Sequence, residues 1–171
     1  LCRTEKQLSK SMKDKIALFC NVDSNSVIPA MDVNSIYEVP LSLEKEGLRE
    51  IILEKIGMKI NQPDLERWKK VNKILKKPSG QVNIGIVGKY VDLKESYKSL
   101  TEALIHGGIG NNVGVKFNWV DAEELESEDG LKQLSECDGV LVPGGFGDRG
   151  IEGKISAVKF ARENKVPYFG I

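Results

Sequence analysis

The sequence predicts an α/β protein built on a parallel sheet that helices cover on both faces. From residue 82 onward, short apolar and β-branched runs alternate with segments whose apolar residues recur at helical spacing. That alternation is typical of parallel strands joined by crossover helices. A shorter α/β segment lies before it, and a lysine-rich stretch with few regularly spaced apolar residues separates the two. We therefore expect α/β segments at residues 1–57 and 82–171, joined by a linker at residues 58–81.

The first segment is expected to contain two helices and short strands. Val27 and Ile28 are β-branched and indicate a strand. Ser42 is a suitable N-cap for a helix with its apolar residues on one side, and Gly57 is expected to end that helix. The first residues of the chain have the character of a strand interior, so we expect the N-terminus to be cut. The expected elements are a helix over residues 13–20, a strand over 26–29 and a helix over 42–56.

The linker is marked by proline, glycine and lysine. Pro63, Pro78 and Gly80 interrupt regular structure, and lysines recur between residues 69 and 77. A short helix is expected around Trp68, and the lysines are expected to form a solvated face.

The second segment has the more regular pattern. Ser96 is expected to cap a helix that ends at Gly107. In the last helix, the apolar residues Ile151, Ile155, Val158 and Ala161 recur at helical spacing, which predicts an apolar face. The expected strands cover residues 82–87, 113–120, 139–142 and 166–171, and the expected helices cover 96–106, 122–134 with a break near Gly130, and 151–164.

Composition excludes several functional classes. The 25 Lys and Arg residues balance the 25 Asp and Glu residues, so net charge favours neither a nucleic-acid nor a membrane partner. An apolar fraction of 40% is ordinary for a globular protein. Cys2, Cys20 and Cys137 show no metal-binding spacing and are expected to be reduced thiols of a cytoplasmic protein. No metal site is expected within the chain.

A glycine-rich loop follows the strand expected at residues 139–142. Four glycines lie within residues 144–150, where they permit a sharp turn and leave backbone N–H groups accessible. Such donors bind an anion or a developing oxyanion. Ligands of open parallel sheets bind at the carboxyl ends of the strands, where this loop lies. We therefore regard it as the candidate site.

Two phosphate-binding motifs fit this chain poorly. Residues 145–150 read GxGxxG, but a dinucleotide fingerprint belongs in the first βα turn. It also needs an acidic residue about 20 positions later, and residues 169–171 supply none. Lys89 follows a glycine as in a Walker A loop, but Tyr90 stands where Ser or Thr is needed. A glycine turn with only a structural role remains the simpler alternative.

Several motifs resemble the CTP synthase family. Residues 143–153 resemble the oxyanion loop of that family's class I glutaminase domain, and residues 161–171 resemble the strand that leads into its nucleophile elbow. The resemblance covers essentially the whole chain in the family's order. The other matching segments are residues 87–90, 97–99, 102–104 and 106–108 at the start of the glutaminase domain, and residues 2–3, 15–20, 32–37 and 39–40 at the end of the amidoligase domain.

The resemblance implies an internal fragment of a ligase. The fold implied is a truncated, flavodoxin-like glutaminase half, preceded by the C-terminal part of a second α/β nucleotide-binding domain, the amidoligase. The implied reaction is the ATP-dependent amination of UTP to CTP with ammonia from glutamine, in pyrimidine nucleotide biosynthesis. It further implies Mg²⁺ as a cofactor, GTP as an activator, CTP as an inhibitor, a cytoplasmic location and a homotetramer.

Residue roles carry over where the motifs match. Without the resemblance, Lys15 would be an ordinary solvent-facing helix lysine, and Met31 a core residue. Arg149 and Glu152 would be an exposed pair at a helix start, which contributes little to stability. The resemblance implies oxyanion and glutamine contacts for Gly144, Gly145 and Phe146, a UTP and CTP contact for Lys15, ATP contacts for Arg3, Met31, Asp32 and Val33, and a role in GTP activation for Arg149, Gly150 and Glu152.

The chain lacks a complete catalytic set. Glutamine hydrolysis of this class needs a Cys nucleophile and a His base. Cys2, Cys20 and Cys137 lie outside the elbow pattern, and His106 fits a helix C-terminal cap. We expect the nucleophilic Cys immediately after Ile171, its His further downstream, and the magnesium ligands upstream. The chain by itself is therefore expected to be truncated and inactive, and the alternative is a non-catalytic homologue with an assembly or regulatory role.

Overall fold

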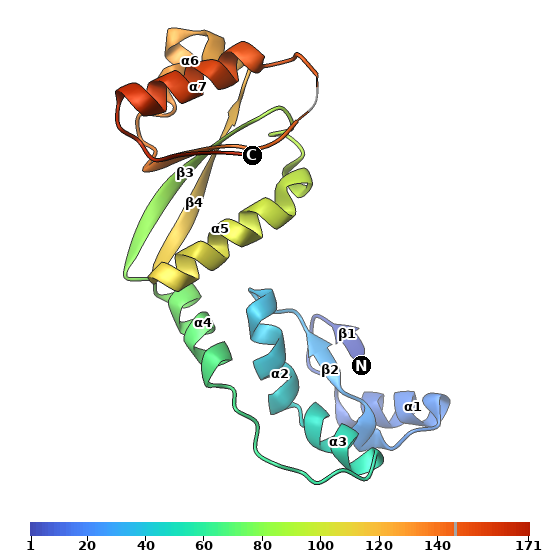
Figure 1. Cartoon of the computed structure of the whole chain (residues 1–171). Helices are drawn as coiled ribbons and strands as arrows, with labels where there is room; N and C mark the ends of the chain where they lie inside the picture. Colours follow the sequence, from blue (N-terminus) through green and yellow to red (C-terminus); the bar gives the residue numbers. More distant parts are fainter. Residues whose placement is uncertain (146) are drawn as a thin grey trace. The chain divides into compact units, whose positions relative to one another are not determined.

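The computed structural model describes residues 1–145 and 147–171 (Figure 1). The chain forms two compact units, Leu1–Lys73 and Ile74–Ile171. Each unit has its own parallel sheet, of two strands in the first and four in the second. The candidate glycine loop belongs to the second unit.

The sheet of the first unit is a parallel pair, β1 (Cys2–Thr4) and β2 (Pro29–Met31), with Thr4 opposite Met31. Helix α1 (Lys10–Cys20) connects them and is followed by the short 3-10 helix η1 (Ser24–Ser26). The helix expected at 13–20 is therefore confirmed and begins three residues earlier, because Ser9 caps it and accepts from the Met12 N–H. The strand expected at 26–29 was wrong in its bounds, since pairing with β1 starts only at Pro29.

The helix expected over residues 42–56 is two helices, α2 (Val39–Lys45) and α3 (Leu48–Lys55). The 3-10 helix η2 (Ile36–Glu38) precedes them. Ser42 lies inside α2 and caps nothing, because Pro40 starts the helix in the first turn, where a missing N–H costs nothing. Gly47, with φ 76°, breaks the run in a left-handed conformation. The expected end is confirmed, since Gly57 follows the last turn of α3 with φ 68°.

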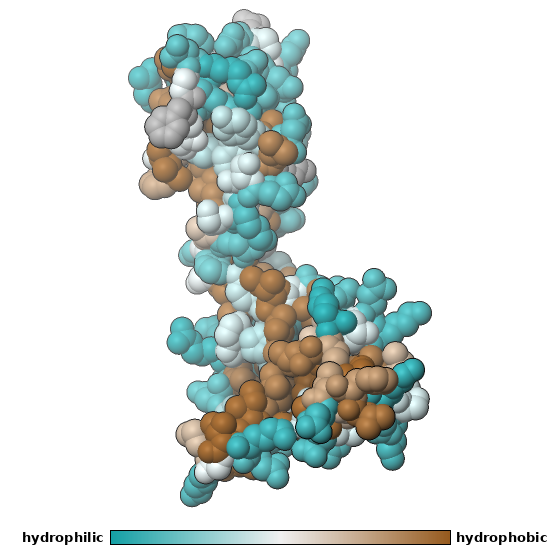
Figure 2. Space-filling model, turned by 90° about the vertical axis from the view of Figure 1, so that its right-hand side faces the viewer, coloured by the Kyte–Doolittle hydropathy of each residue, from teal (hydrophilic) through white to brown (hydrophobic). Residues whose placement is uncertain are grey.

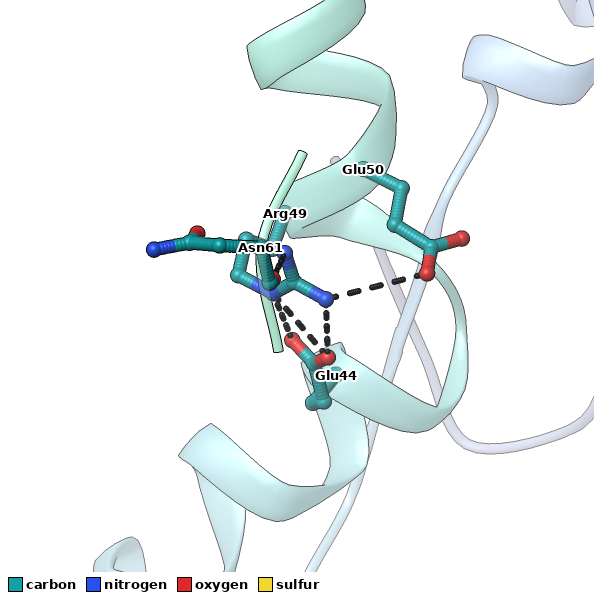
Figure 3. Close-up of polar contacts among 4 residues, drawn as sticks. All are labelled: Glu44, Arg49, Glu50 and Asn61. Atoms are coloured by element: carbon teal, nitrogen blue, oxygen red, sulfur yellow. Dashed lines mark hydrogen bonds and ion pairs between the residues drawn. The ribbon is translucent and has the colours of Figure 1, made fainter. Parts of the chain in front are cut away.

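Arg49 ties the junction of α2 and α3 to the segment that follows (Figure 3). Its guanidinium donates through Nη2 to Glu44 Oε1 at 2.9 Å and through Nε to both Glu44 oxygens at 3.1 Å. Its Nη1 donates to the Asn61 carbonyl, and its Nη2 lies 3.7 Å from Glu50 Oε1. The hydrogen bond to Glu44 is the largest cause of the raised pKa of Arg49. A bidentate pair of this kind is geometrically specific, so the start of the linker is held to the first unit.

The expected linker contains helix α4 (Glu66–Lys76), which confirms the helix expected around Trp68. Asn72 in this helix is buried. Its side chain donates to the carbonyls of Tyr37 at 2.6 Å and Trp68 at 2.9 Å. Buried amides need such partners, so Asn72 fixes the first part of α4 to the N-terminal unit.

The sheet of the second unit has the strand order β4-β3-β5-β6, and every pair is parallel. Helix α5 lies on one side of it, and α6 and α7 lie on the other (Figure 1). The predicted parallel α/β architecture is therefore confirmed. The bounds are β3 (Gly80–Gly88), η3 (Lys94–Tyr97), α5 (Lys98–Asn111), β4 (Val113–Asp121), η4 (Glu124–Glu126), α6 (Glu128–Lys132), β5 (Gly139–Val142), α7 (Ile151–Glu163) and β6 (Tyr168–Gly170).

The core of this unit lies between the sheet and helices α6 and α7. Every second residue of a strand points to this face, so it includes Val87 of β3, Val120 of β4 and Val140 of β5. On the opposite face, Trp119 packs against Phe117 and Tyr97, with ring centroids 6.2 and 5.7 Å apart. The two faces together fix the sheet whose carboxyl ends carry the loop.

Glycines that were expected to end or break helices instead lie inside them. Helix α5 continues past Gly107 to Asn111, and its C-cap residue Asn112 is left-handed with φ 59°. A Cβ at Gly108 would lie 2.7 Å from the Val113 carbonyl oxygen and 2.7 Å from Val115 Cγ2. Gly130 similarly lies inside α6, and a Cβ there would lie 1.9 Å from the Glu124 oxygen. These glycines are needed for close packing, which a single sequence does not display.

Helix α7 turns a different face to the sheet from the one predicted. Ile151, Ile155 and Val158 are exposed, whereas Ala157 and Ala161 are buried. The small residues face the core because they let the helix approach it more closely. The expected apolar face was therefore wrong for Ile151, Ile155 and Val158 and right for Ala161, and the helix itself is confirmed.

The N-terminal unit exposes large apolar side chains, and apolar surface gathers on one of its faces (Figure 2). Leu18 and Phe19 on α1 are 79% and 80% exposed. No helix in the described ranges combines the length and the apolar character of a membrane span. Contiguous exposed apolar surface of this kind marks an interaction surface.

Candidate functional site

The candidate site lies at the carboxyl edge of the four-stranded sheet. Because all four strands are parallel, the segments after them gather at that edge. Lys89 follows β3, Glu123 lies just after β4, the glycine loop of residues 143–150 follows β5, and Ile171 follows β6. The sequence-predicted loop thus lies among groups from three other strand ends.

The backbone of the loop is shaped by two left-handed glycines. Gly147 has φ 77°, and Gly150 has φ 68° at the N-cap of α7. Gly150 is buried, and a Cβ there would lie 2.8 Å from Ala122 Cβ. Conformation and close packing therefore both require glycine at 150.

The end of β6 lies beside the loop. The Ile171 N–H donates to the Val142 carbonyl at 3.0 Å. The Ile171 carbonyl oxygen is 3.7 Å from where a Cβ of Gly144 would stand. Gly144 and Gly145 are exposed, and within residues 1–145 and 147–171 neither N–H donates a backbone hydrogen bond. Gly144 therefore borders the position where the chain leaves Ile171, and Gly145 is the next residue of the loop. Phe146, predicted to flank glutamine, lies outside the described residues.

Lys89 contacts the loop from the end of β3. The residue is 7% exposed, and its Nζ donates to the Gly147 carbonyl at 2.6 Å. In return, Arg149 Nη2 donates to the Lys89 carbonyl at 2.7 Å. Two segments about 60 residues apart in sequence are thereby joined by a bond in each direction.

Lys154 contacts the other end of the loop from the first turns of α7. Its Nζ donates to the Pro143 carbonyl at 3.4 Å. A Cβ at Gly145 would lie 3.6 Å from Lys154 Nζ and 3.8 Å from Lys89 Cδ, so the two lysines flank that glycine. Burial lowers the pKa of Lys154, and the positive charge of Lys89 lowers it further.

Arg149 has partners other than the one predicted. Its Nε lies 3.1 Å from Glu123 Oε1, and its guanidinium lies 5.9 Å from the centroid of the Tyr90 ring. In the described part of the chain no ion pair joins Arg149 to Glu152, which is exposed on α7. The alternative of an Arg149–Glu152 pair at the helix start was therefore wrong. Arg149 instead connects the loop to the ends of β3 and β4.

Only some of the candidate residues of the N-terminal unit lie close together. Arg3 Nη1 lies 2.5 Å from Asp32 Oδ1, and both side chains are more than half exposed. Met31, at the end of β2, pairs with Thr4 beside Arg3, and Val33 follows Asp32. Lys15 is exposed on α1, and no described hydrogen bond or ion pair joins it to this group.

The cysteines take no part in the loop. Cys137 lies before β5, at the end of the strand opposite to the loop. Its thiol is buried, and burial raises its pKa, which is opposite to what a nucleophile needs. Among the described residues no group of three His, Cys, Asp or Glu side chains is placed to hold a metal ion.

Sequence reasoning missed Lys89, Lys154 and Glu123. Lys89 was considered only as a Walker A lysine, although its place directly after a predicted strand was a usable signal. Lys154 lies four residues past the left-handed Gly150 in an ordinary helix, so no local pattern marks it. Glu123 likewise follows a strand end and was not singled out.

Family comparisons cover both units. Residues 1–58 match the model for the CTP synthase N-terminus, and residues 92–171 match the model for class-I glutamine amidotransferase. A solved structure, the glutaminase domain of Trypanosoma brucei CTPS with bound acivicin, is 43% identical. It covers 52% of this chain and 35% of that chain, with a TM-score of 0.49.

Curated relatives match the whole chain. CTP synthase of Ruminiclostridium cellulolyticum is 53% identical over 171 residues, and that of Maridesulfovibrio salexigens is 56% identical over 171 residues. CTP synthase of Methanocaldococcus jannaschii is 51% identical over 177 residues. Each alignment covers 100% of this chain and 32%, 31% and 33% of the respective relative, so the chain spans about a third of their length. Along its whole length the chain is therefore similar to about a third of these CTP synthases, and a segment that matches the CTP synthase N-terminus precedes one that matches class-I glutamine amidotransferase.

Proposed function

We propose that this chain is part of a glutamine-dependent CTP synthase, a ligase of pyrimidine nucleotide biosynthesis. The parent enzyme would aminate UTP to CTP with ATP, using ammonia released from glutamine. Both matched families support this proposal, since one carries the name of the synthase and the other is a glutamine amidotransferase. Agreement above 50% with CTP synthases along the whole chain supports it further.

We assign residues 1–57 to the C-terminal part of the amidoligase domain, 58–81 to the interdomain linker and 82–171 to the start of the glutaminase domain. The matched ranges of 1–58 and 92–171 support this division. The first range is short for a nucleotide-binding domain, and the amidotransferase match follows it after the stretch at residues 59–91, as expected for the end of the synthetase part and a linker. The glutaminase part would have the flavodoxin-like arrangement of parallel strands.

One observation carries the glutaminase proposal: the exposed glycine loop passes beside the end of β6, with the Ile171 carbonyl oxygen 3.7 Å from where a Cβ of Gly144 would stand. In this function the residue after Ile171 is the nucleophilic cysteine. Its thiolate would attack the glutamine carboxamide, and the loop N–H groups would stabilise the oxyanion that forms. The expelled amide nitrogen would leave as ammonia after protonation by a downstream histidine. Phe146 would flank the bound glutamine.

The remaining roles rest on motif agreement and on local geometry. We assign ATP contacts to Arg3, Met31, Asp32 and Val33, because a planar guanidinium and backbone groups suit a purine edge. The Arg3–Asp32 ion pair supports a shared site. Lys15, exposed on α1, is a suitable partner for the phosphates of UTP or CTP.

Effector and assembly roles complete the proposal. We assign GTP activation to Arg149, Gly150 and Glu152, and inhibition to CTP. A homotetramer is supported by the apolar surface of the N-terminal unit (Figure 2), where another subunit or further synthetase sequence would pack. We also propose Mg²⁺ as a cofactor of the parent enzyme, with ligands upstream of this chain.

The test is an assay of the full-length parent protein for CTP formation from UTP, ATP and glutamine. We expect turnover that depends on the cysteine after Ile171, and none from the 171-residue chain alone. Ammonia in place of glutamine should restore CTP formation in the cysteine-to-serine variant. Absence of a cysteine at that position in the reading frame would contradict the glutaminase assignment. Glutamine hydrolysis by the 171 residues alone would contradict the assignment of the nucleophile.

A further inference from the structure

The glycine loop is held by two side chains from outside it, those of Lys89 and Lys154, and by one of its own, that of Arg149. Lys89 Nζ donates to the Gly147 carbonyl at 2.6 Å, and Lys154 Nζ donates to the Pro143 carbonyl at 3.4 Å. These carbonyls lie on either side of Gly144 and Gly145. Arg149 completes the set by donating from the loop to the Lys89 carbonyl at 2.7 Å. The orientation of the loop is therefore fixed at its start and at its far side.

Lys89 carries the largest part of this restraint. Its side chain is almost entirely buried, so the bond to Gly147 is little weakened by competing water. A charged donor makes a shorter and stronger hydrogen bond than a neutral one. The bond also acts on Gly147, which at φ 77° has a left-handed conformation that glycine adopts readily and other residues rarely adopt.

We propose that Lys89 is a positioning residue for the oxyanion loop and acts through the Gly147 carbonyl, with Lys154 as a weaker second restraint at Pro143. Lys89 makes no bond to substrate in this scheme. It keeps the backbone N–H groups of Gly144 and Gly145 directed at the point where the chain leaves Ile171. An oxyanion hole depends on donors that are fixed before charge develops, so loosening the loop lowers the rate of the chemical step.

The backbone around Lys89 is itself held in place. The Tyr97 hydroxyl accepts from the Tyr90 N–H at 3.3 Å and would lie 2.6 Å from a Cβ at Gly88. Residues 88–90 are thus packed against a buried aromatic side chain, which gives Lys89 a firm base. A movable lysine on a flexible strand end would not hold the loop.

This inference rests on the proposed glutaminase function, and one readout of its test is independent of that function. Trypsin cleaves after Arg149 in the restrained loop. In the full-length protein, Lys89→Met keeps the aliphatic stem and removes the donor, so we expect cleavage after Arg149 to become about tenfold faster. Lys89→Arg retains a charged donor and should restore slow cleavage. Lys116→Met, which removes an exposed lysine of β4, is the matched control and should leave the rate unchanged.

Glutaminase kinetics provide the second readout. We expect kcat of Lys89→Met to fall about tenfold with little change in KM, because the lost restraint acts on the transition state. Lys154→Met should show a smaller loss, and Lys89→Arg should recover most of the activity. Unchanged proteolysis in Lys89→Met, or faster proteolysis with unchanged kcat, overturns the positioning role, as does a rise in KM alone. If the wild-type protein does not hydrolyse glutamine, the proposed function fails, and the proteolysis result alone then decides whether Lys89 restrains the loop.

Discussion

Lys89 and Arg149 each donate a hydrogen bond to a backbone carbonyl in the other's segment. Lys89 reaches Gly147 at 2.6 Å, and Arg149 reaches the Lys89 carbonyl at 2.7 Å. Reciprocal bonds resist both sliding and separation of the two segments, which a single bond does not. The proposed GTP contact, Arg149, is therefore also a structural part of the loop, and this dual role leads to the first prediction.

Replacing Arg149 with Met should weaken activation by GTP and also lower glutaminase activity measured without GTP. The second effect follows because the bond to the Lys89 carbonyl is lost. The measurement is glutamine hydrolysis in the full-length protein over a range of GTP concentrations. Glu123→Gln removes only the half-exposed ion pair with Arg149, so it should change the activity without GTP by less than about twofold. Equal effects of the two substitutions would contradict the prediction.

Two glycines of α5 should respond in opposite directions to alanine. At Gly108 the added Cβ would meet the Val113 carbonyl oxygen and Val115 Cγ2 at 2.7 Å, so Gly108→Ala should destabilise by about 1–3 kcal/mol. Gly110 is exposed in the same helix, with no atom within 4 Å of its Cβ position. Gly110→Ala should therefore stabilise by about 0.5–1 kcal/mol. Urea unfolding of both variants beside the wild type measures the difference.

The lowered pKa of Lys154 predicts a pH dependence of stability. In the folded state the ammonium loses its proton below the ordinary value of 10.5, while in the unfolded chain it stays protonated up to that value. The unfolded state therefore binds more protons in the window between the two values, and the contribution of Lys154 to stability rises with pH there. At lower pH the charged ammonium is a fixed destabilising contribution. Unfolding free energies of Lys154→Met should lack this rise, and a rise of equal size in that variant would refute the assignment.

Removing the charge of Lys89 should raise the pKa of Lys154 toward its ordinary value. Burial is the larger cause of the shift and remains, so the recovery should be partial. An NMR titration of the Lys154 side chain in Lys89→Met measures it, with Lys116→Met as the control for a lysine elsewhere in the sheet. Full recovery would show that burial contributes little.

Cys137 should resist alkylation in the folded protein. Its thiol is buried, and burial raises its pKa, so little thiolate forms near neutral pH. Iodoacetamide at pH 8 followed by peptide mass spectrometry should label Cys137 only after addition of denaturant. Rapid labelling under native conditions would contradict the described packing of β5.

The order of elements in the C-terminal unit could be predicted because strand-forming runs and helical periodicity alternate cleanly there. The position of the loop also followed from the sequence, since it comes directly after the run at residues 139–142. Helix limits near Gly108 and Gly130 were wrong because those glycines serve packing between elements, and no local pattern distinguishes such a glycine from a helix end. Most of the predicted face of α7 was wrong for a related reason: the helix lies close to the core, so the small side chains of Ala157 and Ala161 are buried and the larger Ile155 is exposed.

Only part of the candidate site could be predicted from the sequence. Glycines in a loop after a strand are a local signal, and they indicated Gly144 and Gly145. Lys89 and Lys154 reach that loop from elsewhere, and their role depends on which strand ends become neighbours. The strand order β4-β3-β5-β6 decides this, and the sequence pattern alone does not determine it.

The close approach of α7 to the end of β4 also sets how this region tolerates mutation. A Cβ at Gly153 would stand 1.5 Å from the Ala122 carbonyl oxygen, which is main chain, so no exchange of the side chain at 122 makes room for it. Gly147 has nothing within 4 Å of its Cβ position. In a saturation library, position 153 should therefore return glycine alone, while position 147 should accept asparagine or aspartate, the residues that best tolerate its left-handed backbone. Directed evolution of this region can therefore vary position 147 of the loop but not position 153 of the helix that supports it.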